Sequence, residues 1–228
     1  MDYILNIHTS LEKALVNICD GNKVLSTAIN TEQNQHAVFL HVAIKNILKD
    51  HEIQLRDLKA IGVSGGPGSY TGIRVGLATA KGLCFGLNIP MMMFNSLELM
   101  AFSAIQNFSN VGKDSLFCPM IDARRMEVFT AVYNKVLREI IEPTALVLEE
   151  NSFNGLIEKH PFFFFGNGAQ KFEKLAPYSE NLIHSVSDVS TESLAAFSWN
   201  KFQEKSFENL VNSHPFYIKE FYTSLKIN

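Results

Sequence analysis

The sequence has few cysteines and no apolar segment long enough to cross a membrane. Its three cysteines are widely spaced and stand in apolar stretches, which is typical of buried thiols in a reducing compartment and disfavours a disulfide or metal framework. The densest apolar run, Phe162 to Phe165, is far too short to span a bilayer. The first apolar run is interrupted by Asp2, Asn6 and His8, so it does not resemble a signal peptide. These absences predict a cytoplasmic protein with no membrane partner.

An excess of charge of one sign is also missing. The chain has 20 basic and 23 acidic residues, a formal net charge of −3. A protein that binds a nucleic acid by itself usually carries a basic stripe that neutralises several phosphates. Here the lysines and arginines are scattered, and Arg124-Arg125 is the only pair of adjacent arginines. Any role with a nucleic acid should therefore depend on a partner protein.

Common cofactor and metal motifs are absent as well. The sequence has no G-x-x-x-x-G-K-[ST], and Gly66, Gly68 and Gly72 miss the G-x-G-x-x-G spacing. His36 and His41 are five positions apart, which places them on different faces of a helix, whereas metal-binding pairs are three or four apart. We therefore predict no metal, no cofactor and no catalytic residue.

One stretch with unusual composition organises the chain. A short apolar run, Ala60 to Val63, predicts a buried strand, and a helical pattern follows from Ile73 to Phe85. Between them lies a glycine-rich loop: Gly65, Gly66, Pro67, Gly68, Ser69, Tyr70 and Thr71. Ser69 or Thr71 can cap the helix through a hydroxyl oxygen. A strand, a glycine-rich turn and a helix N-terminus together form a possible anion site.

The same stretch contains a hydrolase-like pattern. Gly62 to Gly66 matches G-x-S-x-G with Ser64 at the centre. In a nucleophile elbow the helix begins directly after the serine, but here Pro67 and Gly68 intervene. A serine hydrolase with Ser64 as nucleophile and His214 as base is therefore an alternative that the spacing disfavours.

Strands and helices alternate in a definite order. The first half predicts three strands, a helix, the central strand and the glycine-rich helix, which is the order of an actin-like (ribonuclease-H-like, ASKHA) lobe. The predicted early elements are strands Tyr3–Ile7, Ala14–Cys19 and Val24–Ile29 and a helix from Thr31 to Lys49. The second half repeats the theme with a meander and a four-phenylalanine strand, which should be covered on both faces. The predicted fold is α/β with two lobes and mixed sheets: an N-terminal lobe over 1–108, with the glycine-rich loop and interface helices, and a smaller lobe over 109–228.

Four motifs, in this order, resemble those of one protein family. They are the run GGPGSYTGIRVGLATAKGL from Gly65 to Leu83, Pro119–Arg124, Gly166–Ala169 and Pro215–Lys219. The first is long and specific, and the resemblance extends along the whole chain. The chain resembles the TsaB (YeaZ) family, whose members are the accessory subunit of bacterial tRNA threonylcarbamoyladenosine (t6A) synthesis.

This resemblance implies a non-catalytic scaffold that heterodimerises with a TsaD-like transferase. It further implies that a TsaE-like ATPase joins the complex and that tRNA is contacted only through the complex. Alone, the chain is expected to form a homodimer. His8 stands where many members have Asp or Glu. Because an imidazole does not replace a hard oxygen ligand for Mg²⁺, this departure disfavours the other alternative, an independent actin-like ATPase or kinase. Asp122 and Arg124 fit a hairpin turn, a contact with tRNA or a catalytic pair.

The predicted partner surface lies on the two helices of the first lobe. Gly72, Gly76 and Ala80 are four residues apart and form a stripe with almost no side chain, which would let another helix approach closely. Such a stripe could also pack inside the subunit, but we predict that it faces outward. The predicted interface residues are His36, Leu40, Ala43, Ile47, Gly72, Ile73, Gly76, Leu77 and Ala80.

Overall fold

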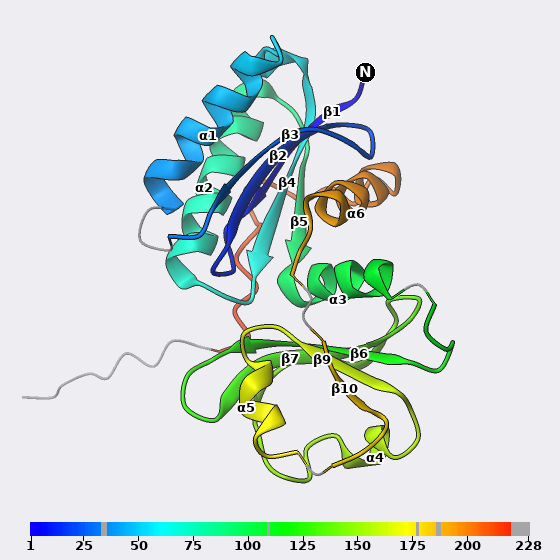
Figure 1. Ribbon diagram of the computed structural model, residues 1–228. Helices are drawn as coiled ribbons and strands as arrows, with labels where there is room; N and C mark the ends of the chain where they lie inside the picture. The colour runs from blue at the N-terminus through cyan, green and yellow to red at the C-terminus, as the bar shows by residue number, and fades with distance from the viewer. Residues whose placement is uncertain (33–35, 109, 177, 186–187, 220–228) are drawn as a thin grey trace, which may run out of the picture.

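Two five-stranded sheets, one in each half of the chain, form the framework of the protein (Figure 1). The structure is a computed structural model that describes residues 1–32, 36–108, 110–176, 178–185 and 188–219. Among these residues, no helix combines the length and the apolar character needed to cross a membrane.

The first sheet has the strand order β3-β2-β1-β4-β5. Its strands are β1 (Tyr3–His8), β2 (Ala14–Asp20), β3 (Lys23–Asn30), β4 (Leu58–Gly66) and β5 (Met91–Asn95). β1, β2 and β3 are antiparallel neighbours, whereas β4 runs parallel to β1 and β5 parallel to β4. This mixed sheet agrees with the predicted strands.

Two helices cover one face of this sheet: α1 (His36–Asp50) and α2 (Tyr70–Leu87). They share a buried core with β1 and β4 that includes Leu5, Ile7 and Val63. The described α1 begins later than Thr31, the residue expected to cap it. A single 3₁₀ turn, Leu55–Asp57, precedes β4.

The second sheet has the order β10-β9-β6-β7-β8. Its strands are β6 (Leu116–Asp122), β7 (Glu127–Asn134), β8 (Glu139–Val147), β9 (Phe162–Phe165) and β10 (Leu182–His184), with the short helices α4 (Asn154–Ile157) and α5 (Ala169–Glu173). β9 lies between β10 and β6, and all four of its phenylalanines are buried. Phe162 and Phe164 enter one core and Phe163 and Phe165 another, which confirms the prediction of a strand covered on both faces.

Helix α3 (Ser96–Asn107) lies between the two lobes (Figure 1). Asn95 caps it by accepting a hydrogen bond from Leu97 N at 2.9 Å. One buried cluster around α3 joins residues of both lobes, from Ile4 of β1 to Phe163 of β9. The lobes therefore share a continuous apolar core.

The last helix, α6 (Thr191–Gln203), returns to the first lobe and packs on the sheet face opposite α1 and α2 (Figure 1). Asn17 Nδ2 of β2 donates to Thr191 O at 3.0 Å, and Glu208 N donates to Met91 O at 2.8 Å. α6 and Glu208 therefore contact the first sheet, although both lie within 109–228, the range predicted for the second lobe.

Candidate functional site

The glycine-rich loop joins the end of β4 to the start of α2. Gly66 and Gly68 have φ values of +109° and +146°, which residues with a side chain rarely adopt. Ser69, one of the two predicted caps, holds the helix start by accepting a hydrogen bond from Gly72 N at 3.3 Å. Thr71 lies inside the first turn and is exposed.

The loop packs against the chain just after β1. Ser69 N donates to Ser10 O at 2.7 Å. A Cβ at Gly68 would collide with the same carbonyl, and one at Gly72 with the carbonyl of Thr9. An anion site needs N–H groups that point toward the ligand. Here the carbonyl oxygens of Ser10 and Thr9 lie against Gly68 and Gly72 instead. Ser69 N and Gly72 N already donate to other atoms of the chain. The glycines therefore serve close packing within the chain.

Ser64 is not placed as a nucleophile. It lies inside β4, is fully buried and accepts a hydrogen bond from Thr9 N at 3.3 Å. The strand continues to Gly66, so there is no sharp turn at the serine. His214, the proposed base, is exposed. The geometry thus gives the hydrolase alternative no support.

The predicted smooth stripe of α2 faces inward, so the expectation that it is exposed was wrong. A Cβ at Gly76 would collide with Thr9 Oγ1 and lie 3.4 Å from Ile7 Cγ2 and 3.6 Å from Val63 Cγ2. The stripe lets α2 approach the chain's own sheet, which was the alternative left open. The other predicted interface residues of these helices are buried too: Leu40, Ala43, Ile47, Ile73, Leu77 and Ala80. His36 begins α1, and its side chain lies outside what the structure describes.

A different stripe faces outward. Ala78, Gly82 and Gly86 are also four residues apart, are exposed, and nothing lies within 4 Å of a Cβ placed at Gly82 or Gly86. Beside it, a groove of about 640 Å³ runs between α1 and α2, lined largely by apolar side chains such as Ile44, Leu48 and Leu83. The same helices expose the large apolar side chains of Val38 (72%), Val42 (54%) and Phe85 (83%). We call this groove and these residues the α1–α2 face.

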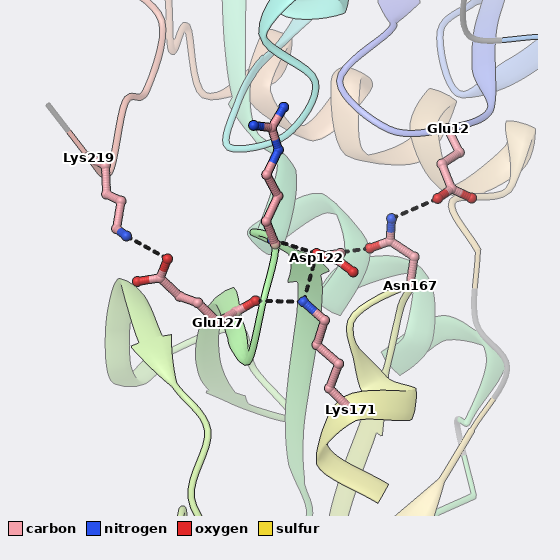
Figure 2. A network of polar contacts seen from close by, with 7 residues as sticks. Glu12, Asp122, Glu127, Asn167, Lys171 and Lys219 are labelled. Atoms are coloured by element: carbon pink, nitrogen blue, oxygen red, sulfur yellow. Dashed lines mark hydrogen bonds and ion pairs between the residues drawn. The ribbon is translucent and has the colours of Figure 1, made fainter. Parts of the chain in front are cut away.

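A second hollow, of about 690 Å³, lies between the lobes and is bounded by the glycine-rich loop, the β6–β7 turn and the C-terminal segment. In the turn, Asp122 Oδ1 accepts from Lys171 Nζ at 2.7 Å and from Arg124 N at 2.6 Å (Figure 2). Burial acts to raise the pKa of Asp122, but the Lys171 ammonium and the Arg124 N–H bring it below its ordinary value. The left-handed φ of Arg124, +71°, completes the turn. These bonds agree with the hairpin-turn interpretation.

Two further connections cross between the lobes (Figure 2). Asn167 accepts from Asp122 N at 2.8 Å and donates to Glu12 Oε1 at 3.0 Å. Lys219, at the end of the described chain, pairs with Glu127 Oε2 at 2.5 Å.

The segment leading to Lys219 is fixed to the first lobe. Phe216 N donates to Gly65 O at 2.8 Å, and Arg74 Nε donates to Tyr217 Oη at 3.1 Å. The motif that ends at Lys219 therefore holds the glycine-rich loop and the second lobe together.

The side chain of His8 is buried, with 2% of its surface exposed. Burial, assisted by the Lys13 charge, lowers its pKa to about 4, so the ring is neutral near pH 7. Within the described chain, no group of three or more His, Cys, Asp or Glu residues could hold a metal ion.

A sequence model of the family described as "TsaD: tRNA N6-adenosine threonylcarbamoyltransferase" matches residues 23–224. The tRNA threonylcarbamoyladenosine biosynthesis protein TsaB of Bacillus subtilis is 33% identical over 168 residues, which cover 72% of this chain and 70% of that protein. The chain belongs to the TsaB (YeaZ) family.

Two further proteins are similar to this chain in sequence or in structure. A tRNA N6-adenosine threonylcarbamoyltransferase of Thermosipho melanesiensis is 24% identical over 194 residues, covering 78% of this chain and 58% of the transferase. The crystal structure "YeaZ from Pseudomonas aeruginosa" covers 95% of this chain and is itself covered completely, with a TM-score of 0.75 at 20% identity. Together with the two mixed sheets, this likeness confirms the predicted actin-like, ribonuclease-H-like fold of TsaB proteins.

Proposed function

We propose that this TsaB family member acts in tRNA threonylcarbamoyladenosine biosynthesis as a non-catalytic subunit that pairs with a TsaD-like transferase through the α1–α2 face. The observation that carries the proposal is this face itself, an apolar groove between two helices flanked by exposed Val38, Val42 and Phe85. Large exposed apolar patches on a protein surface commonly mark interaction sites.

The contacts of the glycine-rich loop support the proposal that this subunit is non-catalytic. Ser69 N of the loop and Gly72 N of α2 are paired within the chain, and the carbonyls of Ser10 and Thr9 face Gly68 and Gly72, so this turn is poorly suited to bind a phosphate. His8 supplies no oxygen ligand for Mg²⁺ at the end of β1. Ser64 is buried and engaged by Thr9 N. These contacts argue against the ATPase and hydrolase alternatives alike.

A TsaD-like partner is favoured because transferases and this chain are similar in sequence. A paralogue with the same fold would present an equivalent pair of helices, so the two proteins could meet in a pseudo-symmetric contact of four helices. In the absence of the paralogue, a second copy of this chain could use the same face in a two-fold homodimer. The slightly acidic composition favours tRNA binding through the complex and not by this chain alone. A TsaE-like ATPase is proposed as a further component of that complex.

The interface can be tested by filling the exposed stripe of α2. Gly82→Leu places a bulky side chain where a partner helix would approach, and overpacking of this kind costs about 1–3 kcal/mol, which corresponds to roughly five- to 150-fold in affinity. Because Leu is a better helix former than Gly, the variant should fold with unchanged or higher stability. Isothermal titration calorimetry with the TsaD-like subunit should show the weakened binding, and light scattering a shift toward monomer.

Gly155→Leu is the matched control, because Gly155 is also a helical glycine with nothing within 4 Å of its Cβ position, but it lies on the second lobe. It should bind the partner normally. If Gly82→Leu binds as tightly as the Gly155 variant while both are folded, the α1–α2 face is not the interface and the proposal is wrong.

A further inference from the structure

A small chamber lies behind the inter-lobe hollow, on the other side of the Glu12–Asn167 hydrogen bond. Its volume is about 120 Å³, the space of about four water molecules. Glu12 and Asn167 line both hollows, so their 3.0 Å hydrogen bond stands between them. The chamber is lined by residues of both lobes and is separate from the α1–α2 face.

The inner part of the chamber combines one polar ring with apolar side chains. His8 is 2% exposed, and neither its Nδ1 nor its Nε2 has a hydrogen-bond partner in the described chain. Buried polar groups in proteins are nearly always paired, and an unpaired one calls for a specific explanation. Leu15 and Met100 beside it are buried and offer no polar group. A neutral imidazole has one donor and one acceptor, so a hydroxyl group can satisfy either nitrogen.

The rim of the chamber carries charges of both signs. Lys13 and Asp188 line it, and neither side chain has an ion-pair or hydrogen-bond partner among the described residues. Glu12 adds a second carboxylate, which accepts only from the neutral Asn167 amide in the described contacts. An ammonium and carboxylates around one opening complement a ligand that carries both charges.

We propose that this chamber binds a small hydroxylated α-amino acid, such as serine or threonine. The ligand's carboxylate would face Lys13, its ammonium group would face Asp188 and Glu12, and its hydroxyl would pair with the His8 ring. The methyl group of threonine would lie against Leu15 and Met100. The site is independent of the subunit interface, so either proposal can fail without the other.

The test compares L-threonine with L-valine, which has the same shape but lacks the hydroxyl. We expect calorimetry to give a dissociation constant for threonine of about 1 mM or tighter. Valine should bind about tenfold more weakly or worse, because it leaves the buried His8 nitrogen unpaired. In NMR spectra of the ¹⁵N-histidine-labelled protein, threonine should shift the imidazole signal of His8, assigned from its loss in His8→Leu.

Two variants test the His8 ring and the charged rim of the chamber separately. His8→Leu should abolish the preference for threonine over valine. Lys13→Gln, at the partly exposed rim, should weaken both ligands about tenfold, whereas Lys59→Gln, an exposed lysine of β4, should change neither. The proposal is overturned if about 10 mM threonine leaves the His8 signal unchanged, if valine binds as well as threonine, or if Lys13→Gln has no effect. The wild-type and Lys13→Gln measurements decide the matter even if His8→Leu does not fold.

Discussion

Gly76 shows how closely α2 approaches the first sheet. A side chain there would displace Thr9, whose hydroxyl donates to Gly72 O at 2.7 Å, and would press on Ile7 and Val63. We therefore expect Gly76→Leu to lower the free energy of unfolding by about 3 kcal/mol or more, because neither the sheet nor the helix can move without opening the core. Urea denaturation followed by circular dichroism measures this change.

Gly82→Leu is the internal control, since it makes the same substitution in the same helix on the exposed side. It should leave stability unchanged or raise it by up to about 1 kcal/mol. Equal destabilisation by the two variants would show that the orientation of α2 is not as described.

The two glycine stripes of α2 also show where prediction from the sequence stops. Gly72-Gly76-Ala80 and Ala78-Gly82-Gly86 have the same spacing, so periodicity identifies two smooth faces without saying which one meets the sheet. The decision depends on Thr9, whose carbonyl oxygen packs against Gly72 and whose hydroxyl packs against Gly76. That contact joins residues far apart in the sequence, and no local pattern reveals it.

At the level of elements, strand β9 depends on burial on both of its faces. Phe163 belongs to the core shared by the two lobes and Phe164 to the core beneath α5, and each is at most 5% exposed. Replacing either by Asp removes about 2 kcal/mol of apolar burial and adds an unpaired buried charge. We expect neither Phe163→Asp nor Phe164→Asp to yield folded protein, as judged by soluble expression and thermal melting.

Phe85→Asp is the control for this pair, because Phe85 on α2 is 83% exposed and should tolerate a charge without loss of stability. Wild-type-like melting of both core variants would contradict the placement of β9.

The sequence predicted most elements because their signals are local. Four consecutive phenylalanines have no polar face, and the strand–loop–helix unit around Gly65 has a specific composition. Strand β10 was missed because it has only three residues, Leu182–His184. The placement of α6 was also missed, since Thr191 and Trp199 meet partners on β2, β3 and the β2–β3 turn that only the folded chain brings near.

At the scale of the whole molecule, a shared apolar core and polar contacts join the two lobes. The core around α3 includes residues of both sheets, and the Glu12–Asn167 and Lys219–Glu127 bonds close the rim of the hollow between them. A phosphotransferase that closes around its substrate needs lobes that move as separate bodies. Here such a motion would expose apolar surface, so we expect the two lobes to stay fixed relative to one another.

This rigidity can be measured as the distance between spin labels at Lys59→Cys and Lys159→Cys, two exposed positions on different lobes. The native Cys19, Cys84 and Cys118 need not be removed, because burial raises the pKa of each thiol to about 12 and keeps it unreactive. In labelled protein diluted with an excess of unlabelled protein, so that a homodimer adds no distances between copies, we expect one narrow distance distribution in double electron–electron resonance that is unchanged by Mg²⁺-ATP. Spin labels at Lys59 and Lys49, both on the first lobe, give the width expected without any lobe motion. A nucleotide-dependent shift between the lobes would restore the kinase-like alternative, because it would show that the core around α3 yields to ligand binding.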